Sequence, residues 1–593
     1  MVTYNKNFHL NLKCSTDADL THRPKAKLFS VVESLYNDYQ ETRQTEHAPA
    51  CLFPQIRERG GEGFTASLYR GALHLEADSP LAAVYGLAQL KAAASSRHLP
   101  DYLGASTPCY AWRPLWLNGD LLCSLTPEIC LFLPSFLCAL DVPLEEQPVF
   151  RSFCLQTLEK GFNTVILGSC QQKNAVSQTQ PPRSLDLQAL CRAFHAYGLK
   201  IILKPTWRCL DPAFRSFLIS PFDPHFRSYL AEHISHLKSA EYDGLMWESQ
   251  STHPQFMQHP LADAASEAEA MLEELKGWEQ NINSGAFFFY YLSATKKEEM
   301  LKQAQRLAFL CQRAGRKTLV VFSAVAGDPW EDFLPPHPVW DHLRQLPDPL
   351  QTPLLPLVNV GAIQQGEGLW PVLTPERIDA VLGRFHRHAF AGMVALTNRF
   401  PDRSGLLACN LWVAGQALWR PLAPSLLMDT WFRAYRSDLS FMTLQKWFNS
   451  LANLTLELRH IQALTREDGS SMLPLEDCRL KAESLLAQLA DLQAIAQKEK
   501  GQSNSPHASI ADYFYYFCRD ARRIIFHFLQ SHRLPFSSFL TGQDMQKSFW
   551  SEAAQGASQG VRQALAIHFA LKPFRGDPGS AMEQIYRENT LVD

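Results

Sequence analysis

Residues 242–249 read Tyr-Asp-Gly-Leu-Met-Trp-Glu-Ser, an apolar run that ends in the carboxylate of Glu248. This run is the fourth of eight, and several of them are separated by stretches with helical periodicity, at 185–197, 224–238, 264–281 and 296–313. Alternating strand and helix patterns are typical of βαβ units and a parallel sheet. Eight runs over roughly 320 residues therefore predict a TIM (β/α)8 barrel with insertions, a fold that displays its chemistry at the C-terminal ends of its strands.

The eight expected strands lie at residues 114–118, 163–168, 199–204, 244–248, 318–323, 354–360, 392–397 and 406–412. A doubly wound open sheet is the alternative arrangement. No GxGxxG or Walker loop follows any of the runs, which argues against the open sheet and against a nucleotide cofactor. We therefore expect an α/β barrel that works without a cofactor.

Two further regions flank the expected barrel. Residues 1–108 predict a small α/β domain with strands at 64–68 and 72–75, followed by a helix at 81–94 that Ser79 caps and Pro80 begins. The barrel would occupy residues 109–437. Residues 438–593 are almost wholly helical in pattern, with a strongly periodic stretch at 475–498, and predict a helical domain packed on the barrel.

Composition narrows the classes of partner. The chain has 593 residues, 46% of them hydrophobic and 19% charged, and its net charge of −3 implies neither a nucleic acid nor an anionic membrane as partner. The most apolar stretch, 129–140, contains Pro134 and is shorter than the about 20 residues of a spanning helix, so no membrane span is expected. Residues 1–12 lack the apolar core of a signal peptide, which predicts a cytoplasmic protein.

The fourteen cysteines are scattered without a CxxC pair or a close His/Cys cluster. In a chain without an export signal they are expected to be reduced and mostly buried. The sequence therefore predicts no metal site. It leaves the oligomeric state open.

Three stretches of the chain follow one another in a recognisable order. Residues 76–90 contain the start of the helix expected to close the N-terminal domain, residues 246–250 read Met-Trp-Glu-Ser-Gln, and residues 410–421 follow the pattern Asn-x4-Gly-x3-Trp-x-Pro. In this order they resemble the α-glucuronidase family of glycoside hydrolases and, more distantly, the β-hexosaminidases. The resemblance implies the same fold and a carbohydrate substrate, either a uronic-acid or a hexosamine glycoside.

The resemblance also implies catalytic residues. Glu248 matches the glutamate that the family presents as its acid. The two acids that serve as candidate bases in the family, after the sixth and seventh strands, correspond here to Gln364 and Arg399, which do not accept a proton as a carboxylate does. Glu367 and Asp402 lie three residues further on in each loop and could replace them, and Asp120, just beyond the first strand, is another possibility. Glycoside hydrolysis normally needs two carboxyl groups, so one of these three would complete the pair.

Other polar and aromatic residues near strand ends are candidates for binding the substrate. Arg208 could bind a sugar carboxylate in bidentate fashion, and Trp207 and Trp419 could stack on a sugar face. The candidate binding residues are Asp120, Trp207, Arg208, Asn359, Gln364, Asn398, Arg399 and Trp419. Plainer interpretations are also open. Trp419 could be a core residue, and Glu248 could form an ion pair with a barrel Lys or Arg.

Three hypotheses follow. The first is a glycoside hydrolase with Glu248 as general acid and Glu367 or Asp402 as base or nucleophile. The second is a barrel that has lost catalysis and serves as a carbohydrate-binding protein or scaffold. The third places the function in the helical region 438–593, where the aromatic run 514–517 could contact a partner.

Overall fold

The computed structural model describes about two fifths of the chain. The described residues are 28, 31–33, 35–37, 51–56, 61–70, 72–94, 99–117, 148–168, 187–204, 228, 231, 240–248, 264–283, 285–292, 307, 318–324, 354–360, 375–385, 390–397, 406–420, 422–435 and 475–500.

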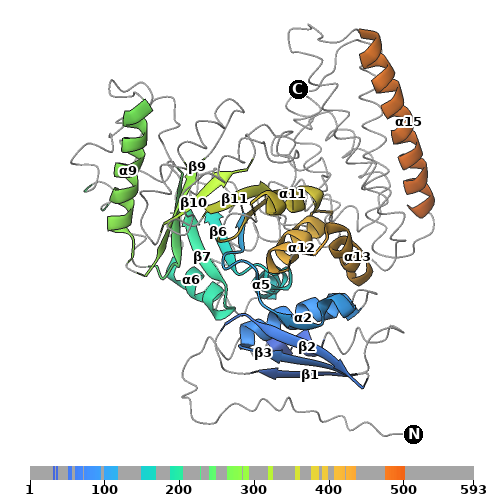
Figure 1. Ribbon diagram of the computed structural model, residues 1–593, viewed down its shortest axis with the longest axis horizontal. Coiled ribbons are helices and arrows are strands. Elements are labelled where there is room, and N and C mark those ends of the chain that lie inside the picture. Colours follow the sequence, from blue (N-terminus) through green and yellow to red (C-terminus); the bar gives the residue numbers. More distant parts are fainter. Residues whose placement is uncertain are drawn as a thin grey trace, which may run out of the picture.

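Eight parallel strands close into a barrel, as the sequence predicts (Figure 1). Each strand pairs with the next in the chain, and the last pairs with the first through Leu396 and Trp116. The strands are β5 (Pro114–Leu117), β6 (Thr164–Gly168), β7 (Lys200–Lys204), β8 (Gly244–Glu248), β9 (Phe287–Leu292), β10 (Thr318–Ser323), β11 (Leu354–Asn359) and β12 (Val394–Thr397).

Two of the strand assignments need correction. The fifth strand is β9, which the sequence analysis missed, so the strands expected as fifth to seventh are the sixth to eighth. Residues 406–412, expected to be the eighth strand, form the first half of α12 (Leu406–Trp419). This helix is buried from Cys409 to Trp419, and an apolar run that is buried on all sides carries no periodicity that separates helix from strand.

The helices between strands largely follow expectation. Helix α9 (Ala264–Asn281) has the predicted bounds, and α6 (Leu187–Ala196) ends before Gly198, whose φ of 74° suits a glycine after a helix. Helix α11 (Pro375–Phe385) precedes β12. The helices expected at 224–238 and 296–313 lie almost entirely outside the described residues.

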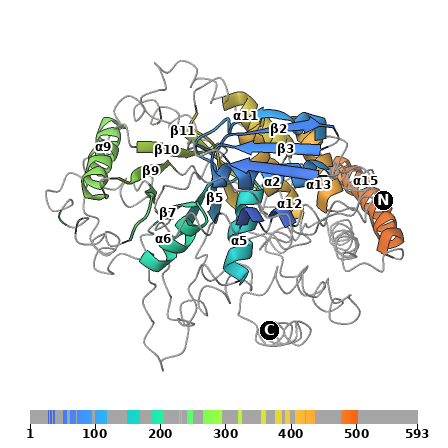
Figure 2. The ribbon, with the colours of Figure 1, turned by 90° about the horizontal axis from the view of Figure 1, so that it is seen from below.

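The N-terminal region contains a four-stranded sheet, of which β2 and β3 are labelled in Figures 1 and 2. Its strand order is β1-β3-β2-β4. Its strands are β1 (Cys51–Ile56), β2 (Phe64–Tyr69), β3 (Ala72–Ala77) and β4 (Gly104–Ser106). Helix α2 (Pro80–Ala94) packs on this sheet, and the Ser79 hydroxyl caps it by accepting a hydrogen bond from the Ala82 amide at 3.1 Å. The expected hairpin and helix are confirmed, and β1 and β4 are additional strands.

Helix α2 lies between this sheet and the barrel (Figure 1), where it contacts α5 (Pro148–Glu159) and α13 (Pro424–Tyr435). The fully buried Arg113 joins the two regions. Its guanidinium donates to the Gly161 carbonyl at 2.7 Å, to the Tyr110 carbonyl at 2.8 Å and to the Glu62 carboxylate at 2.5 Å. A charge so buried is tolerated because it is paired and hydrogen-bonded.

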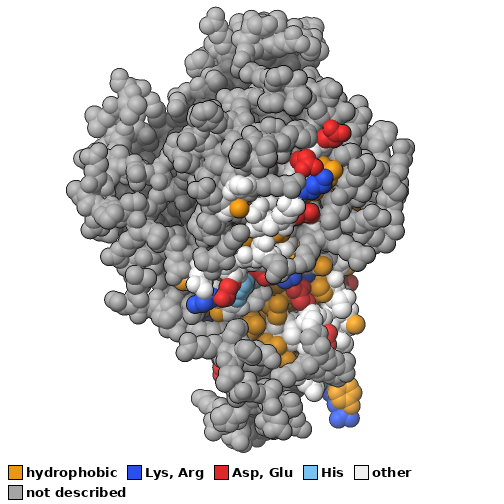
Figure 3. All heavy atoms as spheres, turned by 90° about the vertical axis from the view of Figure 1, so that its left-hand side faces the viewer, with side chains coloured by type: hydrophobic (Ala, Val, Ile, Leu, Met, Phe, Trp, Pro, Cys, Tyr) orange, Lys and Arg blue, Asp and Glu red, His pale blue; other side chains and the backbone are white. Residues whose placement is uncertain are grey.

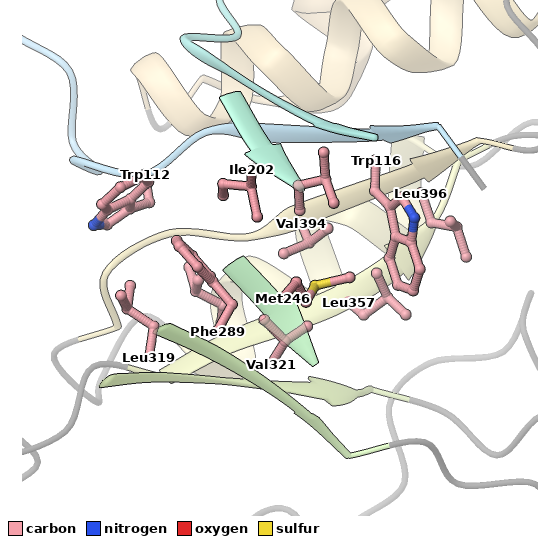
Figure 4. Packing of buried hydrophobic residues seen from close by; sticks show 12 residues of the cluster. Trp112, Trp116, Ile202, Met246, Phe289, Leu319, Val321, Leu357, Val394 and Leu396 are labelled. Atoms are coloured by element: carbon pink, nitrogen blue, oxygen red, sulfur yellow. The ribbon is translucent and has the colours of Figure 1, made fainter. Parts of the chain in front are cut away.

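Large apolar side chains fill the barrel interior (Figure 4). Trp112 lies near the N-terminal ends of the strands and contacts Phe289, whereas Trp116 and Leu396 lie near the C-terminal ends. The interior is therefore a packed core, and a ligand would have to bind outside it, as at the C-terminal ends of the strands where barrel enzymes bind theirs.

Helix α15 (Leu475–Lys500) confirms the periodic stretch that the sequence analysis singled out. The rest of region 438–593, including residues 514–517, lies outside the described residues. Among the described helices, none has the length and apolar character needed to cross a membrane. On the face of the molecule that carries α9, the described acidic and basic side chains are interspersed (Figure 3).

Candidate active site at the barrel mouth

Glu248 ends β8 on the inner side of the barrel. Successive strand residues face opposite sides, and Met246, two positions earlier, belongs to the interior core. The Glu248 carboxylate accepts a hydrogen bond from Lys204 Nζ at 2.9 Å, and the two side chains are 39% and 10% exposed, respectively. Lys204 is the last residue of β7, so the ion pair joins the C-terminal ends of adjacent strands.

Two aromatic rings lie below this pair. Lys204 Nζ is 5.0 Å from the ring centroid of Trp116 and 5.9 Å from that of Tyr291. The two rings meet edge to face with their centroids 5.2 Å apart. The ammonium therefore lies between the apolar core and the more exposed carboxylate, where ring faces and carboxylate all favour its positive charge.

Trp247 points in the opposite direction. Its indole N–H donates to the buried Glu274 carboxylate of α9 at 2.7 Å, and its ring packs on Trp278 with centroids 4.3 Å apart. The apolar neighbour that would help a glutamate keep its proton is thus not this indole. The described neighbours of Glu248 instead include the Lys204 cation. An ion pair with a barrel lysine is the plainer interpretation that the sequence analysis gave for this glutamate.

This arrangement has definite chemical abilities. A half-exposed carboxylate beside an ammonium can accept hydrogen bonds from hydroxyl groups, and as an anion it can stabilise a developing positive charge or act as a nucleophile or base. Among the described residues, no three His, Cys, Asp or Glu side chains form a group that could hold a metal ion.

Most of the other predicted site residues fall outside the described part of the chain. The structure describes the backbone of Asn359, which ends β11 and pairs with Leu396. The remaining candidates, which lie outside the described residues, are Asp120, Trp207, Arg208, Gln364, Glu367, Asn398, Arg399 and Asp402. The pairing of Glu248 with Glu367 or Asp402 therefore stays a prediction.

Trp419 is the exception, and its assignment to substrate binding was wrong. The side chain is fully buried, and its indole N–H donates to the Ser106 hydroxyl at 2.7 Å. Tyr85 packs on the ring with centroids 4.6 Å apart, and the Arg113 guanidinium lies 4.8 Å from the ring centroid. Trp419 therefore joins the barrel to the N-terminal sheet and α2, and no face of its ring is open to a sugar.

The pattern Asn-x4-Gly-x3-Trp-x-Pro has a packing role where it is described. Asn410 donates to the Val360 carbonyl at 3.3 Å. A Cβ atom on Gly415 would lie 1.9 Å from the Lys160 carbonyl oxygen, so only glycine allows α12 to approach the end of α5 so closely. These residues hold α12 against the barrel, so the pattern is a feature of the fold.

Three residues of the site were not predicted from the sequence, namely Lys204, Trp116 and Tyr291. Lys204 ends an expected strand just as Glu248 does, and this shared position was a usable signal. Tyr291 was hidden because its strand was not recognised. Trp116 is inside an expected strand and has no sequence feature that separates it from other core residues.

Comparisons with known proteins agree with the fold. No protein-family model matches the chain, and no curated protein matches it. Among solved structures, a GH138 enzyme targeting pectin rhamnogalacturonan II aligns with a TM-score of 0.51 and 9% identity, covering 96% of this chain and 78% of that one. At that identity the likeness shows a common fold.

Two structures from Streptomyces plicatus are also similar. One is a mutant β-hexosaminidase in complex with its product GlcNAc, and the other is the N-acetyl-β-hexosaminidase in complex with Thio-NAglucal. Each aligns with a TM-score of 0.39 and 11% identity, covering 70% of this chain and 90% of the other.

Proposed function

We propose that the protein is a glycoside hydrolase-like barrel that acts on a carbohydrate at the C-terminal ends of its strands. The observation that carries this proposal is the position of Glu248, a half-exposed carboxylate at the end of the fourth barrel strand. Barrel enzymes place their catalytic groups at such positions. The sequence resemblance to α-glucuronidases supports the same residue, and a uronic-acid or hexosamine glycoside is the substrate class it suggests.

Glycoside hydrolysis needs a second carboxyl group, and we assign it to Glu367 or Asp402. Both follow strands that end at the same face of the barrel as Glu248, namely β11 and β12. The remaining loop residues would bind the sugar. We assign this role to Asp120, Trp207, Arg208, Asn359, Gln364, Asn398 and Arg399.

The second candidate function is carbohydrate binding without catalysis. One observation favours it: the Lys204 ammonium is paired with the carboxylate that would have to donate a proton. The resemblance aligned Gln364 and Arg399 with family bases after the sixth and seventh strands, but these residues follow the seventh and eighth strands of the barrel, so they are not evidence for a lost base.

A hydrolysis screen separates the two. The purified protein is tested against aryl glycosides and uronic-acid oligosaccharides beside Glu248→Gln and a matched control, Glu241→Gln. Glu241 lies just before the same strand, is 58% exposed and pairs with Arg192 at 3.6 Å, so the control makes the same change at the opposite end of β8.

Turnover in wild type and Glu241→Gln that disappears in Glu248→Gln supports the enzyme. Turnover that persists in Glu248→Gln removes the role assigned to Glu248. Absence of turnover together with saturable sugar binding supports the second candidate, and absence of both contradicts the proposal.

A further inference from the structure

Directly behind the candidate site, a buried carboxylate clamps two barrel strands together. Glu274, on α9, is 3% exposed. One of its oxygens accepts a hydrogen bond from the Trp247 indole N–H and the other accepts one from the Tyr290 hydroxyl, each at 2.7 Å. One carboxylate thus holds side chains from β8 and β9 at the same time.

The clamp acts at the level of the candidate site. Trp247 is the register partner of Tyr290, and the next pair along the strands is Glu248 with Tyr291. Because alternate residues face opposite sides, the first pair faces α9 and the second faces the barrel interior. The outward pair that Glu274 holds is therefore one residue from the inward pair that forms part of the site.

Packing reinforces the same contact. Trp278, one turn after Glu274 on α9, packs on Trp247 and is fully buried. It also lies against Phe288 of β9, with ring centroids 6.0 Å apart. A carboxylate buried between a helix and a sheet costs free energy unless its oxygens are hydrogen-bonded, so its presence here needs a reason beyond filling space.

We propose that Glu274 is a positioning residue for the site, which sets the relative placement of Glu248 and Tyr291 by holding the C-terminal ends of β8 and β9 from outside the barrel. The inference rests on the proposed function for its catalytic consequence. Its structural consequence, rigid strand ends at the site, does not depend on that function.

The test uses three variants of the full chain. Glu274→Gln keeps the shape of the side chain but has one acceptor oxygen in place of two. Tyr290→Phe removes a single donor and leaves the carboxylate, which protects the test if the first variant folds poorly. Tyr85→Phe is the control, because it removes a buried hydrogen bond of 3.1 Å to the Phe162 carbonyl at the other end of the barrel.

Hydrogen exchange is the first measurement. Loss of one buried hydrogen bond should make the amides of residues 244–248 and 287–292 exchange about tenfold faster in Glu274→Gln and Tyr290→Phe. The same peptides should exchange at the wild-type rate in Tyr85→Phe. Equal exchange of these peptides in all three variants would overturn the inference.

Steady-state kinetics are the second measurement wherever the wild type shows turnover. A displaced Glu248 should lower kcat about ten- to a hundredfold in Glu274→Gln and leave KM within about threefold. An equal loss in Tyr85→Phe would show a general stability effect and overturn the positioning role. A wild type without turnover contradicts the proposed function alone, and the exchange data then decide about the clamp.

Discussion

The Lys204 ammonium lies 2.9 Å from the Glu248 carboxylate, and the two residues end neighbouring strands of the barrel. The register pairs Leu203 with Leu245, so Glu248 reaches further along the barrel axis than Lys204. A long side chain bridges that offset, and its aliphatic part covers the apolar core while its ammonium meets the carboxylate.

The first prediction concerns the strength of this ion pair. Because Glu248 is 39% exposed, water screens the interaction, and the coupling free energy between the two residues should be about 1 kcal/mol or less. A double-mutant cycle with Lys204→Met, Glu248→Gln and the double variant measures it by urea unfolding. A coupling above about 3 kcal/mol would mean that the pair is a buried structural one, which argues against an accessible catalytic carboxylate.

The second prediction concerns the close approach of α12 to α5. Gly415→Ala would place a methyl group 1.9 Å from the Lys160 carbonyl oxygen, which is backbone and has little room to move. We expect the free energy of unfolding to fall by at least about 3 kcal/mol, since the helices must separate.

Gly383→Ala is the matched control, because a Cβ at this position in α11 meets nothing within 4 Å. Removing a helical glycine from an exposed site should raise the free energy of unfolding by about 0.5–1 kcal/mol. Urea unfolding of both variants checks the pair of expectations, and similar values for the two would show that α12 has room at Gly415.

The barrel was predictable because most of its strands are short apolar runs between helical patterns. β9, with the sequence Phe-Phe-Phe-Tyr-Tyr-Leu, was missed because the expected count of eight was already filled by 406–412. Residues 406–412 belong to α12, which neighbouring helices and the barrel cover, so this helix has no polar face that would give the sequence a helical period. Pattern alone does not separate a buried helix from a buried strand.

The site was predictable only in part. The end of a strand marks Glu248, because a polar residue closing an apolar run on the inner face of a barrel points to the mouth. The partner Lys204 and the clamp at Glu274 depend on the register of neighbouring strands and on the rotation of α9. The strand-end position of Lys204 is visible in the sequence, but its pairing with Glu248 and the hydrogen bonds of Glu274 are not, so side-chain pairing across elements needed the structure.

The third prediction concerns the junction between the N-terminal region and the barrel. Arg113→Met would leave the Glu62 carboxylate and the carbonyls of Gly161 and Tyr110 without the guanidinium that now donates to each of them. Breaking a buried ion pair from one side typically costs about 3–5 kcal/mol, and we expect a loss of that size in urea unfolding.

Arg192→Met is the control for this prediction. Arg192 and Glu241 are 60% and 58% exposed and lie 3.6 Å apart, so their removal should change the free energy of unfolding by less than about 1 kcal/mol. Equal effects of the two substitutions would mean that Arg113 is not the joint between the two regions.

The fourth prediction concerns Lys160, at the end of α5. Burial lowers the pKa of its ammonium from an ordinary 10.5 to about 8, and the neighbouring Glu159 only partly opposes this. Below pH 8 both folded and unfolded chains carry the charge, and the folded chain bears the full cost of burying it. Between pH 8 and 10.5 the unfolded chain binds more protons, so this contribution to stability rises with pH.

Lys160→Met should therefore be more stable than the wild type at pH 7. The pKa difference sets an upper limit of about 3 kcal/mol, and loss of the Nζ hydrogen bond to the Gln156 carbonyl reduces the gain to about 1–2 kcal/mol. The advantage should shrink as pH rises from 8 to 10.5, which urea unfolding at several pH values measures.

Lys276→Met, at a 47% exposed position on α9, should show no such pH-dependent difference. A Lys160→Met variant that is less stable than the wild type by the same amount across pH 7–10.5 would show that the ammonium is well solvated in the folded protein.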